Sequence, residues 1–164
     1  MMTLKTLNDM SESDFVDQLK AIYEHSPWVG ERVLNNRPFL TLEALHSAMV
    51  HAVMGATKSE QLRLIKAHPN LGARIAMSSS SVSEQKGAGL SELTEDEYQR
   101  FQEANQAYMA KFNFPFILAV KGKDKHLIYK ALKERHTNSI DAEFKEALHQ
   151  IHQIARHRLE AIFN

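Results

Sequence analysis

The chain has 164 residues, 43% of them hydrophobic and 24% charged, which is enough for one globular domain with a buried core. Lys and Arg number 20, as do Asp and Glu, so no excess of charge indicates nucleic acid or an anionic membrane as a partner. The absence of cysteine excludes disulfides, thiolate metal sites and cysteine nucleophiles. Residues 1–10 are too polar for a signal peptide, and the longest apolar run, 114–120, is too short to span a membrane. We therefore expect a cytoplasmic protein without a membrane partner.

Hydrophobic residues recur with helical spacing along most of the chain, and most of the segments begin at a capping Ser or Thr. We predict helices over residues 11–24, 26–37, 41–56, 59–67, 71–77, 94–112, 125–136 and 139–162. Only residues 116–120 have the composition of a strand. The prediction is an all-α, single-domain bundle over residues 1–164, with about eight helices and irregular active-site loops.

A histidine directly before a proline is the first candidate for chemistry. Pro69 pushes His68 out of helical geometry, so we expect the preceding helix to end there and to present His68 on a rigid corner. An imidazole with an ordinary pKa near 6.5 suits general acid or base catalysis. The alternative is a surface histidine that favours the dipole at the end of a helix.

A second polar cluster lies at residues 78–85, where four consecutive serines precede Val-Ser-Glu-Gln. Ser81 and Glu84 have the spacing of a capping box, which is one interpretation. The other is a helix N-terminus whose backbone N–H groups bind a small anionic substrate. In that case Glu84 could also orient the imidazole of a nearby histidine.

Two further segments leave alternatives open. Arg158 lies within about 40° of the centre of the apolar face of the last helix. In one interpretation its charged end reaches solvent or forms an internal ion pair; in the other its guanidinium binds a carboxylate or amide oxygen of a substrate. Residues 113–117, which include Phe116 and Ile117, should be extended, because Pro115 disfavours helix before it. They are either plain core or a segment whose backbone groups line a pocket.

Residues 43–46 and 146–149 both have the Glu-x-x-His spacing found in di-metal helix bundles. A helical wheel places both motifs outward or on a flank, and no further inward-facing Glu is evident, so we predict no metal site. His152 and His157 are likewise expected to face solvent.

Several motifs occur together in a characteristic order. They are Ser-Pro-Trp-Val (26–29), Arg-Pro-Phe (37–39), Ala-His-Pro-Asn-Leu-Gly (67–72), Ser-Val-Ser-Glu-Gln (81–85), Phe-Asn-Phe-Pro-Phe-Ile (112–117) and Ala-Arg-His-Arg-Leu (155–159). In these motifs the chain closely resembles the 2-oxo-4-hydroxy-4-carboxy-5-ureidoimidazoline (OHCU) decarboxylases of urate degradation. The resemblance covers nearly the whole chain.

The resemblance implies an all-α fold, a homodimer, and decarboxylation of a small-molecule substrate to (S)-allantoin and CO2 without a metal or organic cofactor. It implies His68 as the catalytic acid/base and Glu84 as its acidic partner. It implies six substrate-binding residues: Pro69, Ser81, Gln85, Phe116, Ile117 and Arg158. Two rival hypotheses are a helical metal-binding or interaction module, and a family member that has lost activity and acts as a scaffold.

Overall fold

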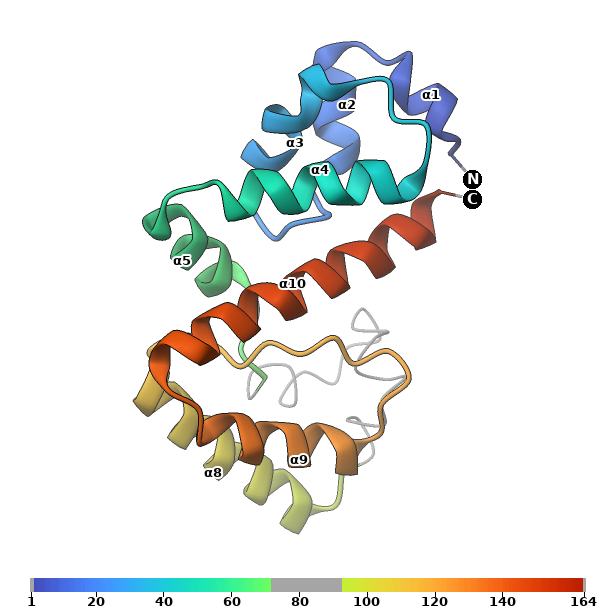
Figure 1. Cartoon of the computed structure of the whole chain (residues 1–164). Coiled ribbons are helices and arrows are strands. Elements are labelled where there is room, and N and C mark those ends of the chain that lie inside the picture. The colour runs from blue at the N-terminus through green and yellow to red at the C-terminus, as the bar shows by residue number, and fades with distance from the viewer. Residues whose placement is uncertain (1, 72–92, 164) are drawn as a thin grey trace. The chain divides into compact units, whose positions relative to one another are not determined.

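The computed structural model describes residues 2–71 and 93–163 (Figure 1). Its helices are α1 (Leu4–Asn8), α2 (Glu12–Leu19), α3 (Trp28–Val33), the 3-10 helix η1 (Leu34–Asn36), α4 (Leu42–Met54), α5 (Lys58–Ala67), α8 (Glu95–Phe112), α9 (Lys125–His136) and α10 (Ile140–Ile162). Within the described ranges the only β pairing is an isolated bridge between Met2 and Phe163. The all-α prediction is therefore confirmed. Of the described helices, none is sufficiently long and apolar to span a membrane.

Most helix starts follow the capping residues that the sequence predicts. Thr94 opens α8 with a complete capping box, because its side chain accepts from Glu97 N–H while the Glu97 carboxylate accepts from Thr94 N–H (both 3.1 Å). Thr41 and Ser139 also cap their helices as expected.

Some helix boundaries differ from the prediction, and one helix was not predicted. Helix α5 is capped by Thr57 rather than Ser59, since the Thr57 hydroxyl accepts from Glu60 N–H at 3.1 Å. Helix α2 ends at Leu19, and the chain then turns, with His25 at a positive φ of 45°. Helix α1 was not predicted, because it is only 5 residues long and shows little periodicity. The predicted helix 71–77 lies almost entirely outside the described residues.

The chain divides into two compact units, Met1–Ala67 with Ile151–Asn164, and His68–Gln150. In the first unit α3 packs against α4, and the buried side chains of α2, α4 and the second half of α10 form the core (Figure 1). In the second unit α8 and α9 lie side by side, and an extended segment, 114–120, joins them. This unit holds His68 and the extended segment.

An aromatic cluster fills the core of the second unit. The Tyr108 ring packs against Phe112, Phe114 and Phe116, with ring centroids 4.6–6.1 Å apart. All four rings are buried. Burial of these rings fixes the extended segment against α8 and so positions the backbone that follows Pro115.

Candidate active site

His68 lies at the corner that the sequence predicts. Helix α5 ends at Ala67, and the next residue is His68, because Pro69 prevents the helix from continuing. The His68 side chain is 5% exposed, whereas Pro69 is exposed. The alternative of a surface histidine is therefore wrong, and the imidazole is held in a shielded position next to an accessible proline.

The corner is tied to α8 by an amide pair that sequence reasoning missed. Asn105 Nδ2 donates to Asn70 Oδ1. Asn105 is 3% exposed and lies on the buried face of α8 with Phe101, Tyr108 and Phe112. Its Oδ1 has no hydrogen-bond partner among the described residues. An asparagine at helical spacing within an apolar face is the signal that could have indicated this contact.

Ser81, Glu84 and Gln85 lie outside the described residues, as does the whole serine cluster. Their assignments therefore stay predictions. Phe116 and Ile117 are described, and both are buried, at 4% and 3% exposure.

The extended segment has no strand partner in the described part of the chain, and side chains satisfy its backbone groups instead. Arg135 Nη1 donates to the Ile117 carbonyl at 2.5 Å. Gln150 Oε1 accepts from Ala119 N–H at 3.0 Å, and Lys123 Nζ donates to the Ala119 carbonyl at 3.1 Å. Such partners are required because buried peptide groups are costly to leave unpaired. These contacts hold the backbone of the segment in a defined position, and its lining of a pocket stays a prediction.

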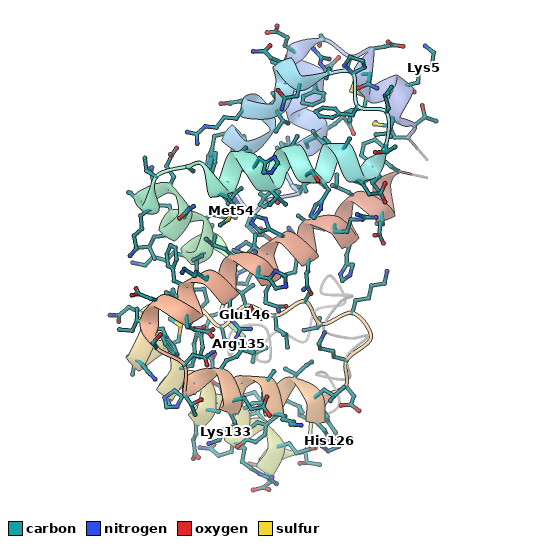
Figure 2. All side chains as sticks on the ribbon, viewed as in Figure 1. Lys5, Met54, His126, Lys133, Arg135 and Glu146 are labelled. Carbon is teal, nitrogen blue, oxygen red and sulfur yellow. The ribbon has the colours of Figure 1, made fainter. Side chains whose placement is uncertain are left out.

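A buried charged cluster lies behind this segment. Arg135 projects from α9 toward the first half of α10, where Glu143 accepts from its Nε and Nη2 (Figure 2). Glu143 is fully buried, and the Tyr108 hydroxyl also donates to it. Burial, and then the hydrogen bond to Glu143, raises the pKa of Tyr108, so the hydroxyl remains a donor at neutral pH. The prediction that no further Glu faces inward was wrong, because Glu143 is paired rather than solvated.

Arg158 forms an internal ion pair. Its Nη2 lies 2.7 Å from Glu24 Oε1, and its Nη1 donates to the Ala21 carbonyl at 3.0 Å. The side chains of Arg158 and Glu24 are each 21% exposed. The structure thus contains the ion pair that the sequence left open, and substrate binding by Arg158 stays a prediction.

The histidines of the first unit have structural partners. The Tyr23 hydroxyl is hydrogen-bonded to His152 Nδ1 at 2.9 Å, and His46 Nε2–H donates to the His152 carbonyl at 2.7 Å. His152 is 8% exposed, so its predicted exposure was wrong; the Tyr23 hydroxyl makes its burial tolerable. His157 is half-buried.

The two Glu-x-x-His motifs are also engaged elsewhere. Glu43 pairs with Arg156 at 2.8 Å, and Glu146 accepts from Gln150 at 3.1 Å. Within the ranges 2–71 and 93–163, no group of three or more His, Asp or Glu side chains could hold a metal ion.

Comparison with known proteins identifies the family of this chain. The family model of the OHCU decarboxylases matches residues 8–160. A 2-oxo-4-hydroxy-4-carboxy-5-ureidoimidazoline decarboxylase of Haloferax volcanii is 42% identical over 163 residues, covering 99% of this chain and 97% of that protein. The chain therefore belongs to the OHCU decarboxylase family.

Other relatives are longer than this chain. A uric acid degradation bifunctional protein of Bacillus sp. (strain TB-90) is 47% identical over 163 residues, which are 99% of this chain and 32% of that protein. The crystal structure of an (S)-allantoin synthase superposes with a TM-score of 0.82 at 34% identity, covering 98% of this chain and 54% of that one. The chain therefore spans about a third to a half of these relatives and nearly all of the Haloferax protein.

Proposed function

We propose that this chain converts 2-oxo-4-hydroxy-4-carboxy-5-ureidoimidazoline to (S)-allantoin and CO2 in urate degradation, with no metal or organic cofactor. The observation that carries the proposal is the placement of His68. The histidine of the family motif is the first residue after α5, is shielded from bulk water, and is fixed by Pro69 and by the bond between Asn70 and Asn105.

The substrate can lose CO2 without a cofactor because it carries its own electron acceptor. When the carbon–carboxylate bond breaks, its electron pair forms a C=C double bond as the electrons of the adjacent C=N group move onto the ring nitrogen, which takes up a proton. The neighbouring hydroxyl then gives up its proton to form the ring carbonyl, and a proton added to the ureido-bearing carbon completes allantoin. The protein has only to orient the carboxylate, move these protons, and protonate one face of the ring.

The side chains fit these tasks. His68 exchanges the protons, with Glu84 as its acidic partner. Ser81 and Gln85 hydrogen-bond the substrate, and Pro69 lines the site. Phe116 and the backbone from Ile117 onward bind the ring, supported by the bonds that fix this segment. Arg158 binds the carboxylate or a ring oxygen. We assign these roles by the match of the residues to the motifs of the family.

The decisive experiment generates the unstable intermediate from urate in situ and follows (S)-allantoin by its optical activity. We expect the wild-type chain to accelerate formation of one enantiomer. His68→Ala should abolish this acceleration while the helical circular dichroism stays unchanged. His51→Ala is the matched control, since His51 is exposed on α4, and it should retain full activity.

Each alternative hypothesis predicts a different experimental result. Turnover retained in His68→Ala would refute the role of His68, and a wild-type chain without activity would favour the scaffold. Stoichiometric iron, manganese or zinc in the purified protein, measured by elemental analysis, would favour the metal-binding module. We also propose that the enzyme is a cytoplasmic homodimer; light scattering that gives the mass of one 18.7 kDa chain would contradict the dimer.

A further inference from the structure

The extended segment after Pro115 depends on side chains for its position. Strands in a sheet are held by a ladder of backbone bonds, but this segment crosses a helical unit. Its conformation therefore depends on the few side chains that reach its peptide groups. Of these, Arg135 is the one that contacts both Phe116 and Ile117, the two residues of the segment assigned to substrate binding.

The guanidinium of Arg135 makes two contacts with the segment. Nη1 donates to the Ile117 carbonyl at 2.5 Å, and the Cζ atom lies 4.5 Å from the centroid of the Phe116 ring. The first contact fixes the peptide plane after Ile117, and the second fixes the ring on the preceding residue. Together they set the direction of the chain where the substrate is to bind.

Glu143 holds the other edge of the guanidinium. Its carboxylate accepts from Nε at 3.0 Å and from Nη2 at 2.5 Å, and Asn138 Nδ2 and the Tyr108 hydroxyl add two further donors. The Arg135 side chain is 10% exposed and that of Glu143 is 0% exposed. A carboxylate with this many donors, wholly out of water, leaves the guanidinium one orientation.

Stability alone does not account for this arrangement. A buried ion pair can be replaced by hydrophobic residues of similar volume with little loss of stability, so its presence needs another reason. The planar guanidinium of Arg135 donates to the Glu143 carboxylate along one edge. It also donates to the Ile117 carbonyl and lies over the Phe116 ring. A lysine ammonium, which is a point charge, cannot do all three.

We propose that Arg135, oriented by Glu143, is a positioning residue that fixes Phe116 and the Ile117 backbone for substrate binding. This inference rests on the proposed decarboxylase function. Arg135 acts through the segment and does not itself touch the substrate. Since the segment would contact the substrate before and during the reaction, its displacement weakens both states alike. The effect therefore falls on KM, while kcat changes little.

The test compares three variants by melting temperature and by steady-state kinetics on the intermediate generated in situ. Arg135→Lys keeps the positive charge but loses the planar array of N–H donors. We expect KM to rise roughly ten- to a hundredfold. The triple variant Arg135→Met/Glu143→Leu/Tyr108→Phe replaces the whole cluster with apolar groups. We expect it to melt near the wild-type temperature and yet show the same rise in KM. Lys133→Met is the matched control, because Lys133 also lies on α9 but is exposed; its KM should equal that of the wild type.

The outcomes separate this inference from the proposed function. A wild-type protein without activity overturns both. An active wild type, together with wild-type KM in Arg135→Lys or in the triple variant, overturns the positioning role alone. If the triple variant does not fold, Arg135→Lys, assayed below its melting temperature, decides the question.

Discussion

Glu143→Gln is the most direct test of the buried charged cluster. The carboxylate is 0% exposed and accepts from Arg135, Asn138 and Tyr108. The amide has nearly the same shape but no charge, so the Arg135 guanidinium would be left buried without a counter-ion. Breaking a buried pair in this way costs about 3–5 kcal/mol, and we expect about 3 kcal/mol because the amide oxygen still accepts. For a chain of this size the melting temperature should fall by roughly 6–12 °C.

Urea unfolding followed by circular dichroism at 222 nm measures this loss. The matched control is Glu134→Gln on α9, whose partner Lys130 lies 3.8 Å away with both side chains about two-thirds exposed (70% and 67%). Exposed pairs contribute little to stability, so the control should unfold with the wild type. A loss below about 1 kcal/mol in Glu143→Gln would refute the reasoning, because it would mean that the guanidinium does not need its counter-ion.

Three further predictions concern the second unit and the dependence of the free energy of unfolding on pH below 4.5. Asn105→Leu should lower kcat/KM roughly tenfold, because the corner that carries the catalytic histidine loses its bond to α8; kinetics equal to the wild type would exclude this contact from catalysis. Thr94→Ala should lower the free energy of unfolding in urea by about 1 kcal/mol, and a change within error would show that the α8 capping box is not formed in solution. Hydrogen bonds lower the pKa of Glu97 (from Lys125, then Thr94) and that of Glu60 (from Arg32, then Thr57), each to about 2 from 4.5. Their stabilisation is thus complete above pH 4.5 and is lost as the pH falls toward 2, so Glu60→Gln and Glu97→Gln should flatten that part of the stability profile; parallel profiles would contradict it.

Local sequence was enough to define most helices and the histidine corner. Capping boxes and helical periodicity depend on residues three or four apart, and these act within one element whatever packs against it. Thr94 with Glu97 and His68 before Pro69 are examples, and both are found as predicted. The motif order also led to the family, which the comparison confirmed.

The identity of the buried polar partners depended on the tertiary structure. Periodicity identifies the face of a helix, but it does not show whether a residue near its edge meets solvent or another element. The sequence alone therefore predicted a solvated His152, which the Tyr23 hydroxyl bonds, and did not identify Glu24 as the partner of Arg158.

Glu143 and Arg135 show this limit most clearly. Both are charged residues near helix ends, and the sequence around each one predicts a side chain exposed to solvent. Only the packing of α8, α9 and the first half of α10 around residues 114–120 removes them from water. Local sequence thus determined the helices and the histidine corner, whereas contacts between distant segments decided which charges are buried and what they hold in place.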